Sequence, residues 1–167
     1  FISKGKLPPE LHGVTDCEKM RLFGKDAGER ELLELWRNNR KGIHWKDKQG
    51  NILRGAVDNI LVNGNKLVVL DYKTRGASVK DDTAEKYQKQ LDICTFLLME
   101  NGHKMEDYSF LLFYHPREVL EGGEVLFTTE LIKMKTSPQK GKKIFMDAIK
   151  LLSGECPGKS CGWCEGR

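Results

Sequence analysis

The sequence predicts an α/β protein: a mixed central sheet flanked by helices, followed by a Cys-rich tail. Helical apolar patterns alternate with strand-length apolar runs along the 167 residues. Two of these runs are joined by Asn63-Gly64, which is a strong hairpin signal. With 39% hydrophobic and 31% charged residues, the chain is expected to form one globular domain with a real core. No apolar run approaches the roughly 20 residues that span a bilayer, so membrane proteins are excluded.

The first half of the chain is expected to hold one helix and one hairpin. Residues 1–13 predict an irregular lead-in, because they contain two prolines and two glycines. Residues 26–39 predict a helix, because an aspartate precedes apolar residues at helical spacing. A basic loop is expected over 40–48. Strands are expected from 51 to about 62 and, after the tight turn, from 66 to 74.

The second half repeats this pattern and ends in a helix. A long helix is predicted over 82–101, because aspartates precede it and Asn-Gly follows. The apolar run 109–114 predicts a strand that His115-Pro116 ends. After a Gly-Gly turn, another strand is expected over 124–134. Ser-Pro then begins a last helix over 137–152.

Three of the five cysteines lie within the last twelve residues, as Cys156, Cys161 and Cys164. Their C-x4-C-x2-C spacing, with small residues between, is typical of a metal site. Three thiolates leave one position open in a tetrahedral zinc site or a four-cysteine iron–sulfur site. We therefore divide the chain into a domain over 1–153 and a metal-binding tail over 154–167 that packs on it.

The charge balance permits a polyanionic partner without demanding one. The chain has 28 basic and 24 acidic residues, a formal charge of +4. It has no signal-peptide core, so a reducing, cytoplasmic compartment is expected. It begins at Phe1, which is consistent with a truncated N-terminus. Basic residues gather in two segments, where a solvated face is the ordinary reading and phosphate contacts the functional one: Arg37, Arg40, Lys41, Lys46 and Lys48, then Lys133, Lys135, Lys140, Lys142 and Lys143.

The predicted hairpin carries charged residues within apolar strands. If Asn63 and Gly64 are the two loop residues, Asp58 faces Val69 and shares a face with Asp71 and Lys73. The two aspartates then lie on a diagonal, with Cα atoms roughly 7–8 Å apart. Two such carboxylates suit Mg²⁺ or Mn²⁺, and a lysine beside them suits phosphodiester hydrolysis. The spacing alone equally allows a structural ion pair between Asp71 and Lys73.

These residues, with Gln90 on the next helix, resemble the PD-(D/E)XK nuclease superfamily. The nearest branch is the RecB-like nucleases, which include CRISPR-associated exonucleases with an iron–sulfur cluster. The resemblance implies a restriction-endonuclease-like core and a metal-dependent DNA nuclease. It also implies that Asp58, Asp71 and the backbone carbonyl of Tyr72 bind the metal, that Lys73 serves the attacking water, and that Gln90 supports the site.

The sequence departs from that family in two places. The family motif Q-x-x-x-Y has Cys94 in place of its tyrosine here. We interpret Tyr87 and Cys94 as core residues, because they lie in one apolar stripe at helical spacing. The family's upstream histidine has two candidates, His12 and His44, of which we select His44 as a metal ligand.

The family also suggests a role for the tail. An upstream cysteine, here Cys17, would join the three tail cysteines around a [4Fe-4S] cluster, with Zn²⁺ as the alternative. Single-stranded DNA or DNA ends would be the substrate, and proteins of a repair or defence complex would be partners. The rival hypotheses are a catalytically inactive module for nucleic-acid binding or assembly, with a structural Fe–S or Zn site, and a zinc-ribbon adaptor.

Overall fold

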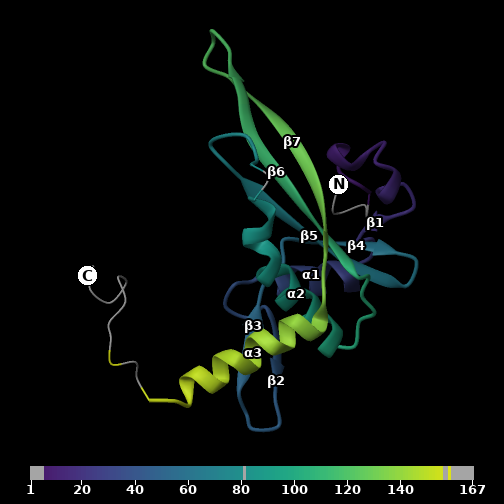
Figure 1. Ribbon diagram of the computed structural model, residues 1–167. Helices are drawn as coiled ribbons and strands as arrows, with labels where there is room; N and C mark the ends of the chain where they lie inside the picture. The colour runs from purple at the N-terminus through teal and green to yellow at the C-terminus, as the bar shows by residue number, and fades with distance from the viewer. Residues whose placement is uncertain (1–5, 81, 156–157, 159–167) are drawn as a thin grey trace.

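A five-stranded mixed sheet forms the centre of the computed structural model, which describes residues 6–80, 82–155 and 158. All neighbouring strands are antiparallel except β5 and β6, which are parallel. The predicted α/β class is therefore confirmed (Figure 1). The strand order is β1 (Arg21–Leu22), β4 (Asn59–Asn63), β5 (Lys66–Thr74), β6 (Tyr108–Val119) and β7 (Val125–Lys135).

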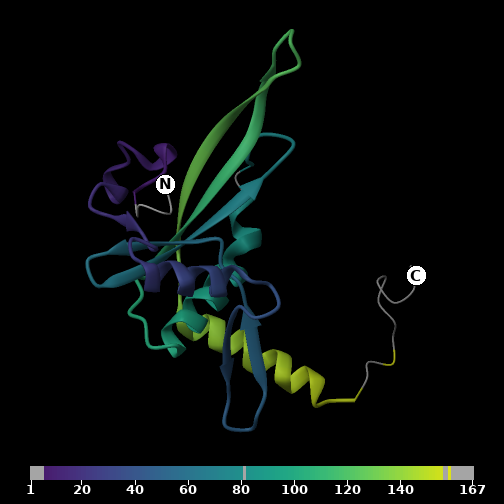
Figure 2. The same cartoon turned by 180° about the vertical axis from the view of Figure 1, so that it is seen from behind.

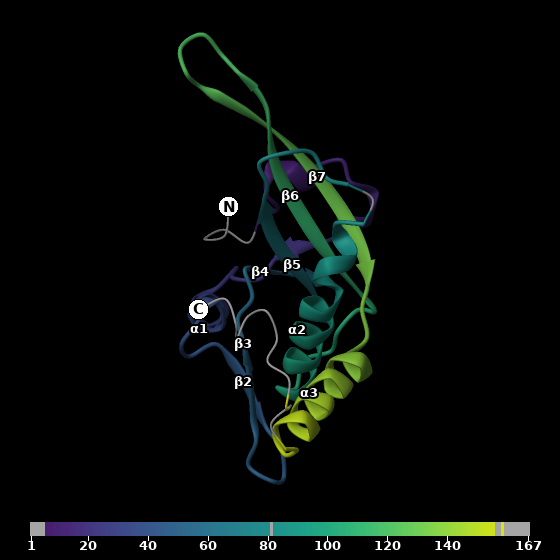
Figure 3. The ribbon, with the colours of Figure 1, turned by 60° about the vertical axis from the view of Figure 1, so that its left-hand side comes forward.

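Helices lie against one face of this sheet (Figures 1 and 3). They are α1 (Ala27–Arg37), α2 (Gln88–Glu100) and α3 (Pro138–Leu152), and α3 packs on α2. Asp26 caps α1, because its Oδ1 accepts the N–H of Glu29 at 2.9 Å. No helix among the described residues is long and apolar enough to cross a membrane.

The opposite face of the sheet is covered by the N-terminal segment (Figure 2). This segment contains the 3-10 turns η2 (Pro9–Leu11) and η3 (Thr15–Cys17). Successive residues of β5 point to opposite faces, so Val69 packs with the helices and Leu70 packs with the N-terminal segment. Burial on both faces explains why β5 has an almost continuous apolar sequence.

The predicted strand over 51–62 is interrupted. It forms β3 (Ile52–Gly55) and β4, and Asp58 lies in the gap between them. The predicted loop over 40–48 contains a further strand, β2 (Ile43–Lys46), which pairs with β3 as a separate hairpin. Trp45 of β2 packs against Phe96 and Phe145 of α2 and α3, with ring centroids 5.1 and 5.5 Å away. This contact packs the hairpin against α2 and α3.

The β4–β5 turn lies one residue later than expected, which shifts the register of the two strands by two residues. Asn63 pairs with Lys66, so the loop residues are Gly64 and Asn65. Gly64 has a φ of +57°, as a Gly-first two-residue hairpin turn requires. Because the shift is even, every side chain keeps its face. Asp58 is therefore level with Asp71 rather than diagonal to it.

The strand predicted to end at His115-Pro116 continues to Val119. The carbonyl of Tyr114 accepts the N–H of Arg75 on the β5 side, so Pro116, two residues later, turns its nitrogen to the same side. β5 has already ended at this point, so the missing N–H of the proline interrupts no hydrogen bonds between β5 and β6. A register shift between Pro116 and Glu118 follows. The outer β6–β7 hairpin projects beyond the rest of the molecule (Figure 1).

Candidate active site

Asp71 and Lys73 project from β5 towards α2. Asp71 is only 3% exposed, and its Oδ1 accepts a hydrogen bond from Gln90 Nε2 at 2.8 Å. The ammonium of Lys73 contacts the other oxygen, Oδ2, as an ion pair rather than as an aligned hydrogen bond. Burial raises the pKa of the Asp71 carboxyl, Lys73 opposes this, and the charge of Asp58 adds to it.

Asp58 is exposed in the gap between β3 and β4, and a closed ring of hydrogen bonds fixes it there. Its Oδ2 accepts the N–H of Tyr72 at 2.9 Å, and its backbone oxygen accepts Arg37 Nε at 2.7 Å. Arg37 Nη2 donates to Asn59 Oδ1 at 2.7 Å, and Asn59 Nδ2 donates to the Tyr72 hydroxyl at 3.1 Å. Arg37 at the end of α1 thereby holds the gap between β3 and β4 in place.

Solvent reaches the site beside this ring. A shallow pocket of about 610 Å³ opens there, lined by Arg37, Val57, Asp58, Asn59 and Tyr72. Asp58 therefore faces solvent in this pocket, and Gln90, the donor to Asp71, is exposed as well.

The oxygen donors fit a hard divalent cation. Asp58, directly before β4, is level with Asp71 on β5, and the Tyr72 carbonyl lies between Asp71 and Lys73 in the chain. No group of three His, Cys, Asp or Glu residues that could hold a metal occurs in the described part of the chain. Mg²⁺ needs no such group, because one or two carboxylates with water and phosphate oxygens suffice.

Comparison with known protein families matches residues 14–167 to the PD-(D/E)XK nuclease superfamily. The chain belongs to this superfamily. Membership supports a nuclease-type phosphodiesterase that acts on nucleic acid with Mg²⁺ or Mn²⁺. No curated protein gives a match.

The two stripe residues Tyr87 and Cys94 differ in what they contact. Cys94 is 5% exposed, burial raises the pKa of its thiol to about 12, and its Sγ lies 3.7 Å from the Ala56 oxygen. It fills space, as predicted. Tyr87 instead places its ring 4.7 Å from Lys73 Nζ. Helical spacing marked Tyr87 as a core residue and gave no signal of this contact.

The histidine selected upstream lies on the β2–β3 hairpin. His44 lies exposed on β2, and its backbone oxygen accepts Asn101 Nδ2 at 3.1 Å. Because β2 belongs to the separate hairpin, the described contacts do not connect His44 to the two aspartates, and its role as a metal ligand stays a prediction. The other candidate, His12, has its Nε2 3.1 Å from the Leu7 oxygen.

Cys17, the proposed fourth ligand, lies in the core. The Cys17 side chain is fully buried under the sheet, and burial raises the pKa of its thiol. Cys156, Cys161 and Cys164 lie outside the described residues. The end of α3, which precedes them, is on the other side of the molecule from the N-terminal segment (Figures 1 and 2). The shared cluster stays a prediction.

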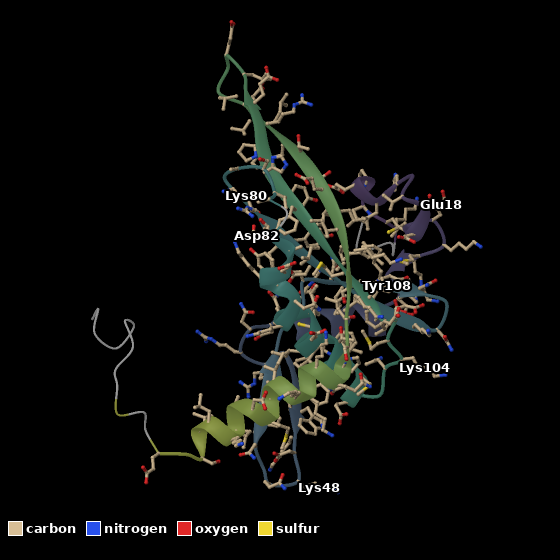
Figure 4. All side chains as sticks on the ribbon, in the orientation of Figure 1. Glu18, Lys48, Lys80, Asp82, Lys104 and Tyr108 are labelled. Atoms are coloured by element: carbon tan, nitrogen blue, oxygen red, sulfur yellow. The ribbon has the colours of Figure 1, made fainter. Side chains whose placement is uncertain are left out.

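Several basic residues have partners within the protein. Lys133 pairs with Asp16 at 3.1 Å and lies 4.1 Å from the Tyr108 ring, and Lys143 pairs with Asp147 at 2.8 Å. Lys48 lies at the tip of the β2–β3 hairpin, and Lys80 and Asp82 lie in the segment between β5 and α2 (Figure 4). Lys133 and Lys143, which the sequence offered as phosphate contacts, thus have carboxylate partners within the protein.

Proposed function

We propose that this chain is a RecB-like DNA nuclease that acts as an exonuclease on single strands or DNA ends. The observation that carries the proposal is the convergence of Asp58, Asp71, Lys73 and Gln90 from three separate segments of the chain, with Asp58 lining an open pocket. A buried carboxylate with a raised pKa and a specific charged partner is characteristic of functional sites.

Each residue has a role that follows from its contacts. Asp58, Asp71 and the Tyr72 carbonyl would hold Mg²⁺ or Mn²⁺, which supplies charge stabilisation on the phosphoryl oxygens and acidifies a bound water. Gln90 holds the Asp71 carboxylate in one orientation through its 2.8 Å hydrogen bond. Lys73 presents a compact cation with three N–H groups, which orients the attacking water or the scissile phosphate.

Cleavage assays on purified protein test this proposal. With Mn²⁺, wild type should digest linear single-stranded DNA and leave closed circles intact, and Asp71→Ala and Lys73→Ala should lose the activity. Lys66→Ala is the matched control, because this lysine begins the same strand and pairs with Glu106 instead. An inactive wild type, or Asp71→Ala protein that cuts normally, would show that the assignment is wrong. Digestion of closed circles would exclude exonuclease action alone.

A second candidate function is a catalytically inactive nucleic-acid-binding or assembly module. The observation in its favour is that both carboxylate oxygens of Asp71 already have partners, Gln90 at Oδ1 and the Lys73 ammonium at Oδ2. Titration with Mn²⁺ separates the two functions. The nuclease should bind Mn²⁺ in a way that Asp58→Ala weakens, whereas the inactive module should bind none at this site.

For the rest of the chain we propose a nuclease domain over 1–153 and a metal-binding tail over 154–167. The spacing of Cys156, Cys161 and Cys164 supports a [4Fe-4S] cluster, with Zn²⁺ as the alternative and Cys17 as the proposed fourth ligand. A cytoplasmic location and protein partners in a repair or defence complex complete the proposal.

A further inference from the structure

The ring of Tyr87 forms one wall of the space around Lys73. Tyr87 ends the short turn η4 (Ala84–Tyr87) that leads into α2, and the ammonium of Lys73 lies 4.7 Å from its ring centroid. The ring edge packs on Phe113, whose centroid is 5.9 Å away at an interplanar angle of 62°. Phe113 is fully buried and is the register partner of Lys73 on β6. The Tyr87 ring therefore contacts both Lys73 and Phe113, the register partner of Lys73, and its packing on Phe113 fixes its position.

This wall suits the ammonium for a chemical reason. A lysine side chain has four rotatable bonds, so a catalytic lysine needs something to hold it in place. Asp71 attracts Lys73 from one side, and the negative π face of Tyr87 attracts it from another. The side chain is 17% exposed, so water screens this attraction only partly. A π face also accepts no conventional hydrogen bond, which leaves the ammonium N–H groups free for Asp71 and for water or phosphate.

We propose that Tyr87 is a positioning residue that holds the Lys73 ammonium in place for catalysis. The proposal rests on the proposed nuclease function, because it assigns the residue that orients the lysine of that site. Among the described residues, Tyr87 forms no hydrogen bond with either aspartate, and its ring contacts are with Lys73 and Phe113. Its removal should therefore slow the chemical step and leave substrate and metal binding unchanged.

Steady-state kinetics with Mn²⁺ and single-stranded DNA test the proposal. Tyr87→Leu should lower kcat about tenfold and leave KM and the affinity for Mn²⁺ unchanged. Tyr87→Phe should retain kcat within about twofold, because its ring keeps the π face. Tyr108→Leu is the packing control: Lys133 Nζ lies 4.1 Å from the centroid of this ring, which packs in the hydrophobic cluster on the opposite face of the sheet. It should lower the melting temperature and leave kcat unchanged.

Coupling to Lys73 separates positioning from general packing. In a Lys73→Ala background, Tyr87→Leu should lower the residual rate no further. NMR of the lysine side chains provides a reading that does not depend on activity: the Lys73 ε signals, assigned with Lys73→Arg, should show an upfield ring-current shift in wild type and Tyr87→Phe and lose it in Tyr87→Leu. The same measurement shows whether Tyr87→Leu is still folded.

The outcomes distinguish the two hypotheses. If wild type cuts no DNA, the nuclease proposal fails and the role of Tyr87 fails with it. If wild type cuts and Tyr87→Leu has normal kcat, or lowers the rate equally without Lys73, only the positioning role is overturned. A Lys73 signal unaffected by Tyr87→Leu would also overturn it.

Discussion

Carboxylates that are partly or fully buried experience opposite environments in different parts of this protein. Asp71 loses hydration at the site, and its pKa is raised in spite of Lys73. Partial burial pushes the pKa of Glu29 upward too, but hydrogen bonds from Arg21, Gly24 and Lys25 overcome this and lower it from 4.5 to about 2. Ionisation of Asp71 therefore destabilises the folded state, whereas ionisation of Glu29 stabilises it.

Replacing Glu29 with glutamine should remove a pH-dependent stabilisation. A depressed pKa in the folded state contributes stability above about pH 4.5, which is lost as the pH falls towards 2. The melting temperature of Glu29→Gln should therefore lie below that of wild type at pH 7, and the difference should shrink below pH 4.5. Thermal melts from pH 7 to pH 2 measure it, and a constant difference would contradict the ion pair with Arg21.

Side-chain type and spacing revealed the central residues of the site but not their supports. Asp58, Asp71 and Lys73 could be predicted to share a face because a strand alternates strictly, and even a two-residue register error preserves the face. The roles of Arg37 and Tyr87 depend on tertiary contacts, Arg37 to Asp58 across 21 residues and Tyr87 to Lys73 across 14. A single sequence carries no signal of such pairs.

Helices α2 and α3 touch at a glycine. A Cβ on Gly141 would overlap the backbone oxygen of Asp92 and come within 2.8 Å of its carbonyl carbon. Because backbone cannot move aside as a side chain can, Gly141→Ala should separate the helices and cost roughly 1–3 kcal/mol of unfolding free energy. Denaturant unfolding monitored by circular dichroism measures this cost.

The matched control is Gly28→Ala in α1, where the added Cβ would lie 3.6 Å from its nearest neighbour, Asp26 Oδ1. That substitution should raise the stability by roughly 0.5–1 kcal/mol, as alanine does in an unstrained helix. Equal effects of the two variants would show that α2 and α3 are not in close contact.

The end of α1 positions a proposed metal ligand, so damage to α1 should affect metal binding. Arg37→Ala removes the donors to the Asp58 oxygen and to Asn59. Supporting residues of this kind commonly contribute about 10–100-fold to metal affinity, and we expect a loss of that size for Mn²⁺. Isothermal titration in the absence of DNA measures it. Arg54→Ala should bind Mn²⁺ normally, because Arg54 is exposed and bonds only to Arg40 of the described residues.

Local patterns determined most elements, and long-range contacts determined the exceptions. The helix over 26–39 was predictable from its cap, and 66–74 from its apolar run. β2 was not, because 40–48 is polar and Trp45 finds its partners on α2 and α3. We expected Pro116 to end a strand, but β6 continues past it. Proline is tolerated there because β5, the strand on the side of its nitrogen, has already ended, and a sequence pattern does not show where a neighbouring strand ends.

At the scale of the whole chain, the candidate site on the sheet is followed in the sequence by the three cysteines of the proposed metal-binding tail. A triple variant, Cys156→Ser, Cys161→Ser and Cys164→Ser, should lose the brown colour and bound iron of anaerobically purified wild type and should have a lower melting temperature. Elemental analysis with a visible spectrum measures this. Cys94→Ala should keep the iron, because Cys94 is buried in the core. Zinc instead of iron in wild type would identify the alternative.

Because β5 is shorter than β6, the rate of amide hydrogen exchange should differ between two parts of the sheet. β5 pairs with β6 only as far as Tyr114. Beyond that residue, the outer hairpin consists of β6 up to Val119 and β7 from Val125 onward, which pair only with each other among the described residues. Two isolated strands are marginally stable, so their amides should exchange with solvent much faster than those of β5. Asp71 and Lys73 lie on the slowly exchanging side of that boundary. The hairpin can therefore open and close many times while the carboxylates keep their geometry.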